Sequence, residues 1–235
     1  MKLNFSVKWL LAFLSLIFLI IECHDWSHVA VARIFCGCWG DKGFEDWKIC
    51  DSCVLEKGNQ AMVWLAGPLI NYVLLWVGWR FMGHTQRLTR KSLGFFLVYA
   101  TSPLARILAA KSGGTDETNA FRILFQRSDG SNHYWVALAS LMMILILALP
   151  PIIRSIGLIS GWPNRAIVIT LFLVVPMYLD RWIVQIGLQK MLQEGVLPDK
   201  TFFGTHVLVI AWFALVALIL IICRKSLSTG LIQSR

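Results

Sequence analysis

Apolar stretches long enough to cross a bilayer constrain this chain more than any other feature. A transmembrane helix needs about 20 mostly apolar residues, because the hydrocarbon core of a bilayer is about 30 Å thick. Such stretches predict six spans, near residues 7–33, 60–82, 92–110, 133–153, 164–186 and 203–223. The stretch at 92–110 is interrupted by Thr101, Ser102 and Pro103. We therefore expect an all-α fold, a polytopic membrane bundle of about six transmembrane helices.

The composition agrees with a bilayer as the surroundings of the chain. Of the 235 residues, 57% are hydrophobic and 15% are charged, and the mean hydropathy is +0.66, which is too apolar for a water-soluble domain. The formal net charge of +9 does not indicate a nucleic-acid partner, because the basic residues fall between the apolar stretches. With no internal repeat, residues 1–235 are expected to form a single integral membrane domain.

The distribution of basic residues predicts how the chain is oriented. If six spans alternate, the basic residues that flank them fall on one side, which the positive-inside rule assigns to the cytoplasm. These are Lys2, Lys8, the cluster at 80–91, Arg154, Arg165, Arg224 and Lys225. The loops at 36–59, 111–132 and 187–202 then face outward, and we expect a multi-pass protein of the plasma membrane. The apolar run Trp9 to Ile21 lacks a small-residue cleavage site, so we interpret it as a retained helix.

A polar cluster interrupts the first apolar stretch. Ionisable residues inside a membrane segment are costly and face a cavity or a partner, which makes a functional site the default hypothesis. His24 and His28 are four residues apart, so a helix places both on one face, where they can chelate one zinc ion. Asp25 would then accept a proton from water on the metal. The alternatives are hydrogen-bonded helix histidines, or a membrane segment that ends at Ile21.

Two segments resemble a known family. The segment from His24 to Gly37, His-Asp-Trp-Ser-His and then an apolar stretch with Arg33, resembles the first motif of the site-2 protease family. This M50 group of intramembrane zinc metallopeptidases carries H-E-x-x-H there. Ala66-Gly67-Pro68-Leu69-Ile70-Asn71 is similar to the family's A-G-P-x-x-N segment. The resemblance covers residues 1–120, where it implies a three-helix metallopeptidase-like core, and it leaves additional helices in 121–235.

The resemblance also implies roles for individual residues. It implies a zinc cofactor on His24 and His28, and a substrate backbone held by Asn71, Gly67 and Pro68. The family's catalytic Glu is replaced by Asp25, whose carboxylate reaches about 1.5 Å less far. Glu22 is a weaker substitute. Without the resemblance, Gly67-Pro68 would mark an ordinary kink, with Asn71 bonding the freed backbone groups.

The family's L-D-G element, which supplies its third metal ligand, is absent from this sequence. We expect Asp116, since the break at residues 101–103 and the two glycines Gly113 and Gly114 bring it towards the histidines. Asp180 is the alternative. Asp116 is otherwise a solvated helix start, and Asp180 is otherwise the partner of a neighbouring cation.

The cysteines suggest a stabilised outward loop. Cys36, Cys38, Cys50 and Cys53 lie in the first loop, where one or two disulfides, a small structural zinc site or free thiols are the alternatives. Cys23 adjoins His24, but on a helix it points about 100° away from it, so we expect it to pack. His84, His133 and His206 lie near span ends and suggest no second metal site.

These observations predict a membrane-embedded zinc metallopeptidase. It would hydrolyse peptide bonds in or near transmembrane segments of membrane-protein substrates, which would unwind in a cleft between the first three spans. The alternatives are a catalytically inactive, protease-like metal-binding scaffold and an ion or small-solute transporter.

Overall fold

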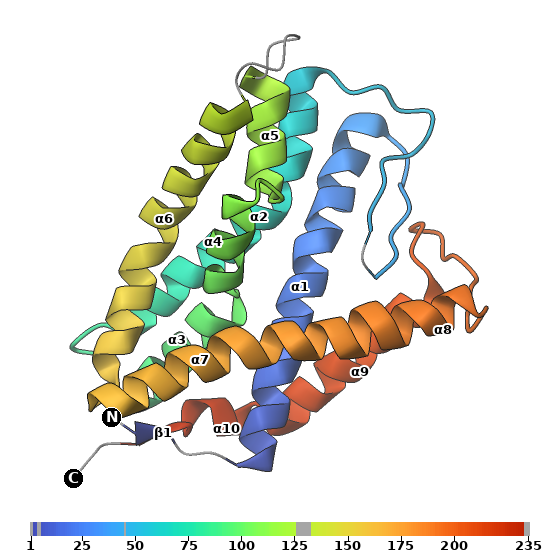
Figure 1. Ribbon diagram of the computed structural model, residues 1–235. Coiled ribbons are helices and arrows are strands. Elements are labelled where there is room, and N and C mark those ends of the chain that lie inside the picture. The colour runs from blue at the N-terminus through green and yellow to red at the C-terminus, as the bar shows by residue number, and fades with distance from the viewer. Residues whose placement is uncertain (1, 4–5, 45, 126–132, 233–235) are drawn as a thin grey trace.

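The computed structural model describes residues 2–3, 6–44, 46–125 and 133–232, and most of these residues are in helices (Figure 1). The all-α prediction is confirmed for these residues. The two-residue strands β1 (Lys2–Leu3) and β2 (Leu231–Ile232) pair antiparallel and bring the two ends of the chain together. The helices in chain order are α1 (Val7–Cys36), α2 (Lys57–Phe81), α3 (Leu88–Ala100), α4 (Pro103–Lys111), α5 (Asp116–Phe125), α6 (His133–Leu158), α7 (Trp162–Leu179), the π-helix η1 (Asp180–Leu188), α8 (Gln189–Gln193), α9 (Val207–Cys223) and α10 (Lys225–Ser228).

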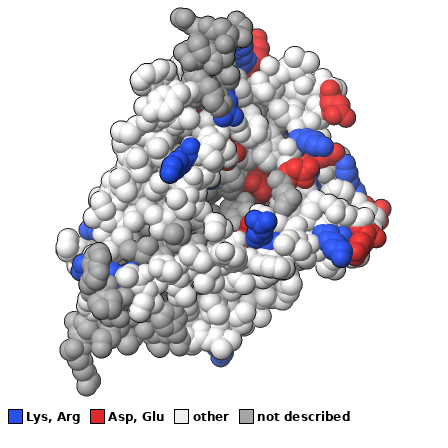
Figure 2. All heavy atoms as spheres, in the orientation of Figure 1, with Lys and Arg blue, Asp and Glu red and all other residues white. Residues whose placement is uncertain are grey.

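Five helical segments of the described chain are long and apolar enough to cross a membrane. They are Val7–Cys36, Lys57–Phe81, Leu88–Lys111, Tyr134–Leu158 and Arg165–Gln193. The remaining predicted span is the shorter apolar helix α9. Large apolar side chains cover the outside of the bundle, and most of the face in Figure 2 carries no charge. Such a surface is too apolar for water and suits an integral membrane protein.

Helix α1 runs unbroken through the polar cluster. It begins after Ser6, whose hydroxyl accepts a hydrogen bond from the Trp9 N–H at 3.1 Å. It is 30 residues long and ends at Cys36. The next residue, Gly37, has a φ of 73° and donates its N–H to the Arg33 carbonyl. Glycine adopts this left-handed conformation without strain, as helix ends require. The helix therefore does not end at Ile21.

The predicted break in the third apolar stretch is confirmed. Helix α3 ends at Ala100, Ser102 has a φ of 49°, and Pro103 starts α4. A proline disfavours the helical conformation of the residue before it but is well placed at the start of a new helix. The chain turns again at Gly113, with a φ of 71°, and enters α5 at Asp116.

Three predicted loop boundaries are corrected by the structure. The loop expected at 111–132 contains α5, which begins with two acids that favour a helix N-terminus. The loop expected from residue 187 is helical to Gln193, because α7 continues into η1 and α8. The last span begins at Val207 rather than near 203. Hydropathy marks only the apolar part of a helix, so it misses polar helical turns. Residues 126–132 of the expected outward loop lie outside the described residues.

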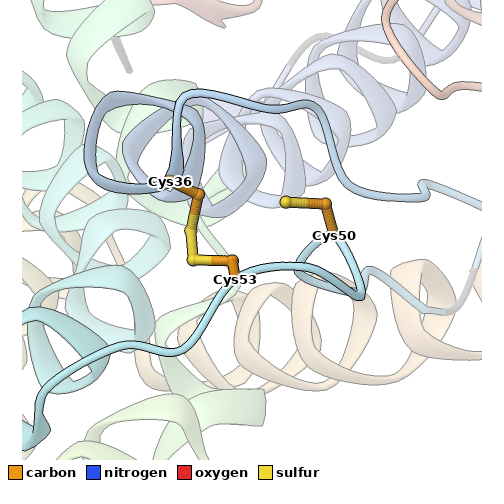
Figure 3. A group of neighbouring side chains, drawn as sticks. All are labelled: Cys36, Cys50 and Cys53. Atoms are coloured by element: carbon orange, nitrogen blue, oxygen red, sulfur yellow. A yellow bond between two sulfur atoms is a disulfide. The ribbon is translucent and has the colours of Figure 1, made fainter.

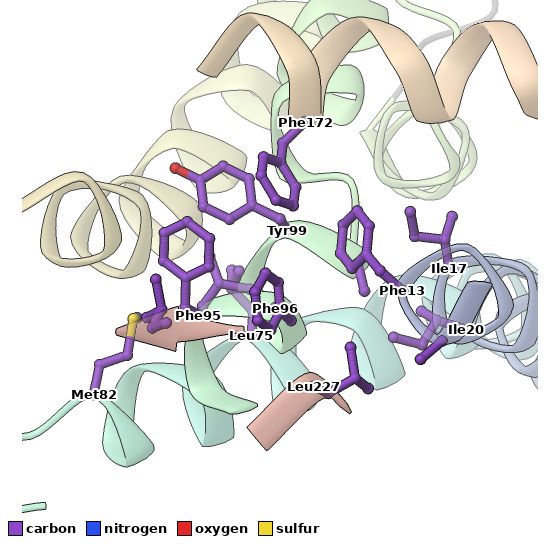
Figure 4. Packing of buried hydrophobic residues seen from close by; sticks show 14 of the residues in the cluster. Phe13, Ile17, Ile20, Leu75, Met82, Phe95, Phe96, Tyr99, Phe172 and Leu227 are labelled. Carbon is purple, nitrogen blue, oxygen red and sulfur yellow. The ribbon is translucent and has the colours of Figure 1, made fainter. Parts of the chain in front are cut away.

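Aromatic residues fill the core on one side of the polar cluster (Figure 4). Phe13 of α1, Phe95 and Tyr99 of α3 and Phe172 of α7 pack together. The Phe13 and Phe172 rings meet edge to face with centroids 4.8 Å apart. Burying these rings holds α1, α3 and α7 together, which positions the walls of the site described below.

The segments predicted to share a side of the membrane lie at the same end of the bundle. The Ser226 hydroxyl donates to the Lys8 carbonyl at 3.1 Å, which joins the start of α1 to α10. At the other end, Lys200 pairs with Asp41 at 2.7 Å and joins the loop before α9 to the loop after α1. This arrangement agrees with the alternation of spans that the basic residues predict.

Candidate metal centre

Three side chains that the sequence suggests as metal ligands meet in the structure. His24 Nε2 lies 2.9 Å from Asp116 Oδ2 and 3.2 Å from His28 Nε2. His28 Nε2 lies 3.8 Å from Asp116 Oδ2. The two histidines come from adjacent turns of α1, and Asp116 comes from the first turn of α5. The fold thus brings Asp116 to the histidine pair across 92 residues of sequence.

This geometry fits a zinc ion. Two ligand atoms on tetrahedral zinc, each about 2.0–2.1 Å from the metal, lie about 3.3 Å apart. The three separations of 2.9, 3.2 and 3.8 Å lie around that value. Two imidazole nitrogens and one carboxylate oxygen are also a donor set that zinc accepts.

The surroundings of His28 fix which ring nitrogen is available. Its Nδ1 lies 2.7 Å from the Val63 carbonyl oxygen, which only accepts hydrogen bonds. The proton therefore sits on Nδ1, and Nε2 turns its lone pair towards His24 and Asp116. His28 is fully buried, and the Trp47 ring stacks on it with centroids 4.5 Å apart and planes at 8°.

Gly67 allows α2 to pass directly against the histidine pair. A Cβ at this position would lie 2.5 Å from His24 Cε1 and 2.6 Å from His24 Nε2, and it would also collide with His28 Nε2. Only a glycine fits there without moving the imidazoles. The role of Gly67 is therefore to leave room for the two imidazole rings.

A cavity of about 450 Å³ opens beside the cluster. His24, Asp116 and Asn71 are on its wall, whereas Gly67 and Pro68 are buried in α2 and are not. The Asn71 Oδ1 is buried and makes no hydrogen bond within the described residues. Figure 2 shows a hollow on this face with acidic side chains inside it. The cluster is thus accessible from one side.

The cavity differs from the cleft expected between the first three spans. Phe172 and Pro176 of α7 and Asp180 of η1 also line it. The site is thus completed by helices outside the expected core of residues 1–120, because α7 lies across α1 and α3 (Figure 1). Asp180 accepts a hydrogen bond from Gln185 at 3.1 Å and is not part of the three-ligand cluster.

Asp25, the expected proton acceptor, lies in an ion pair. Its Oδ2 accepts a hydrogen bond from Lys42 Nζ at 3.1 Å, and Asp25 is not on the cavity wall. The same Nζ lies 3.1 Å from Glu22 Oε2 and donates to the Gly43 carbonyl at 2.8 Å. Burial acts to lower the pKa of Lys42, but the two carboxylates outweigh it and raise that pKa above its ordinary value. Lys42 is therefore a charged, fully buried partner of both acids.

The role of Lys42 is not apparent from the sequence motifs. Two acids three residues apart in a membrane helix require a compensating cation, and that requirement is the signal that points to a lysine in the following loop. Which cation pairs with the two acids depends on how the loop after α1 folds back onto the helix.

The chain was compared with protein-family models, with curated proteins and with solved structures. None of these comparisons finds a match. The function is therefore inferred from the site.

A second polar network holds Asp116 in place. Arg106 of α4 donates through Nε and NH2 to Glu117 Oε1 at 3.2 and 3.0 Å. Its NH2 also donates to Asp116 Oδ2 at 3.3 Å. The Tyr72 hydroxyl of α2 donates to the same Glu117 oxygen at 2.7 Å. The network links α2, α4 and α5 and orients the carboxylate that joins the histidines.

Two disulfides close the loop that carries Lys42 and Trp47. They join Cys36 to Cys53 and Cys38 to Cys50. Figure 3 shows the Cys36–Cys53 bond at the end of α1, with Cys50 beside it. Disulfides persist in oxidising compartments, which agrees with an outward-facing loop. Cys23 is a free cysteine outside the metal-ligand cluster, and it is exposed, so the expectation that it packs is wrong.

Proposed function

We propose that this chain is a membrane-embedded zinc metallopeptidase that hydrolyses peptide bonds in or near transmembrane segments of membrane proteins. The observation that carries the proposal is the convergence of His24, His28 and Asp116 beside a cavity among apolar helices, with His24 and Asp116 on its wall. Three protein ligands with space beside them are typical of a catalytic zinc site, whereas structural sites have four. The resemblance of the two motifs to the site-2 protease family supports the same proposal.

The chemistry follows from the ligand set. Zinc held by these residues would lower the pKa of water to about 7 and polarise a peptide carbonyl. The hydrogen bond from His28 to Val63 and the contact of Arg106 with Asp116 keep the ligands oriented for the metal.

The cavity suits an extended peptide segment. A helical substrate keeps its carbonyls bonded, so it has to unwind locally before water can attack. Asn71 lines the cavity, and its buried Oδ1, which has no hydrogen-bond partner among the described residues, would accept a hydrogen bond from an N–H that such unwinding frees. This role agrees with the one that the resemblance implies for Asn71.

Asp25 is the residue we assign to proton transfer. One of its oxygens is held by Lys42, while Oδ1 makes no hydrogen bond within the described residues and would be the accepting atom. In this role Asp25 takes a proton from the attacking water and returns it to the leaving amine nitrogen.

A metal-binding scaffold without catalysis is the second candidate function. The ion pair of Asp25 with Lys42, away from the cavity wall, favours it. In a scaffold the metal would stabilise the junction of α1 with α5, and Asp25 would serve only to balance the charge of Lys42.

Metal analysis and turnover of the detergent-purified chain test the proposal. We expect stoichiometric zinc in the wild type, its loss in His24→Ala, His28→Ala and Asp116→Ala, and its retention in Asp180→Ala. We also expect cleavage of a membrane-peptide substrate that Asp25→Asn abolishes without loss of zinc. Zinc without cleavage would favour the scaffold. A wild type that binds no zinc when zinc is supplied in excess would exclude both functions.

A further inference from the structure

Arg106 is the one lysine or arginine among the described residues that line the cavity. Its neighbour on that wall is Asp116, the carboxylate that completes the metal cluster. We propose that Arg106 binds the carbonyl oxygen of the scissile peptide and stabilises the negative charge that forms there during hydrolysis. This inference rests on the proposed peptidase function and adds a catalytic residue to it.

The guanidinium is held in a fixed orientation with one group still available. Nε and NH2 donate to Glu117 and Asp116, whereas NH1 makes no hydrogen bond within the described part of the chain. Only 15% of the side chain is exposed, so the low-dielectric surroundings strengthen any bond that NH1 makes. NH1 is therefore a charged donor without a partner among the described residues, on a guanidinium whose NH2 contacts the candidate ligand Asp116.

The groups behind Arg106 preorganise it. Glu117 is fully buried, and the Tyr72 hydroxyl bonds the same oxygen that accepts from Arg106. A donor held in this way needs no reorganisation when charge develops, which is the condition for strong electrostatic catalysis. A purely structural ion pair would not require the cation to line a cavity.

Arg106 and Asn71 together complement one peptide backbone. Both residues line the same cavity, and among the described residues Arg106 NH1 is a donor without a partner and the buried Asn71 Oδ1 is an acceptor without one. A peptide group offers a carbonyl oxygen and an N–H, so an unwound substrate can satisfy both residues. Asn71 would hold the backbone both before water adds and in the anionic tetrahedral state. Arg106 would bind the carbonyl oxygen more strongly as that oxygen becomes charged.

The step assigned to Arg106 is the addition of water to the carbonyl. The water oxygen forms a bond to the carbonyl carbon, and the carbon–oxygen π pair moves to the oxygen, which becomes anionic and accepts from NH1. One water proton passes to Asp25. When the carbon–nitrogen bond breaks, its electron pair goes to nitrogen, which takes that proton, and the carbonyl re-forms.

The variant Arg106→Gln tests this role by separating binding from catalysis. We expect kcat to fall about 100- to 1,000-fold, as on removal of one donor to a developing oxyanion, with little change in KM. The affinity for a phosphinic pseudopeptide, whose tetrahedral anionic group imitates the charged state, should fall by a similar factor. With zinc supplied in excess, zinc content should stay stoichiometric, and Arg106→Lys should recover part of kcat. Arg154→Gln removes a cation that lies over Trp79, away from the cavity, and should change none of these values.

A second variant guards against misfolding, because Arg106→Gln leaves the buried Glu117 carboxylate without its cation. In the double variant Arg106→Gln with Glu117→Gln, both members of this ion pair are uncharged, so no buried charge loses its partner there. The double variant should show the same loss of kcat and of affinity for the phosphinic pseudopeptide. Retained kcat in the double variant would overturn the inference. So would a fall in zinc content that accounts for the lost activity, because Arg106 would then act only through Asp116. If the wild type neither holds zinc nor cleaves peptides, the proposed function fails first and the inference fails with it.

Discussion

At the scale of single residues, charge compensation decides which polar groups can exist inside this bundle. Glu22 and Asp25 share Lys42, and Asp116 and Glu117 share Arg106. Each of the two cations thus serves two acids in surroundings where an uncompensated charge is very costly. One cluster holds the loop after α1 on that helix, and the other holds Asp116, the proposed third metal ligand.

The Lys42 cluster leads to a prediction about stability. Lys42→Met leaves two acids without their buried cation, so we expect a loss of about 3–5 kcal/mol, measured as a lower thermal midpoint in detergent. Adding Glu22→Gln should recover part of the loss. Lys190→Met is the control, because Lys190 and Glu194 are 70% and 60% exposed. An equal effect of Lys190→Met would contradict this explanation.

At the scale of the helices, close approach of α2 to α1 shapes the candidate metal centre. Gly78 and Gly94 allow a similar approach of α2 to α3, since a Cβ at Gly78 would lie 2.8 Å from the Gly94 carbonyl oxygen. The sequence motif around Gly67 is thus explained by packing between helices.

Gly67→Ala tests the role of this packing in the metal centre. The added methyl group displaces His24 and His28. We therefore expect zinc affinity to fall about 10- to 100-fold, which is the usual effect of losing a group that orients metal ligands. Gly58→Ala is a matched control in the same helix, because a Cβ there meets no atom within 4 Å. Equal zinc affinity in the two variants would show that the histidines adjust freely.

The disulfide-closed loop gives a second prediction at this scale. The Cys36–Cys53 bridge spans a sequence separation of 17 residues, for which the entropy model predicts about 3 kcal/mol of stabilisation. Treatment with a thiol reductant should therefore lower the thermal midpoint and loosen Trp47 from His28. Quenching of tryptophan fluorescence by an aqueous quencher should increase. Midpoint and quenching that are both unchanged after verified reduction would refute this role of the bridges.

At the scale of the whole molecule, the charges and the disulfides predict the same orientation. Basic residues flank one end of the bundle, and the loop with the two bridges lies at the other. In intact cells, a membrane-impermeant thiol reagent should label the variant Asp199→Cys but not Thr85→Cys. Thr85→Cys should become reactive after the membrane is opened. The reverse pattern would mean that the disulfide loop faces the cytoplasm.

Features that depend on neighbours in the sequence were predictable. The apolar stretches predict the helices, the four-residue spacing places His24 and His28 on one face, and the residues at 101–103 predict the break before α4. These features follow from local backbone geometry and from the cost of placing polar groups in lipid. The sequence also narrowed the third ligand to Asp116 or Asp180.

Other features came only from the tertiary structure. The contact of Asp116 with His24 joins residues 92 positions apart, and the pairing of Lys42 with Asp25 depends on a loop folding back on its helix. The place of α7 in the cavity wall likewise depends on how aromatic rings pack. Local patterns determined which helices form and which polar residues need partners. The packing of side chains from distant segments decided which partners they find, because a buried charge is satisfied by whatever the whole fold brings within reach.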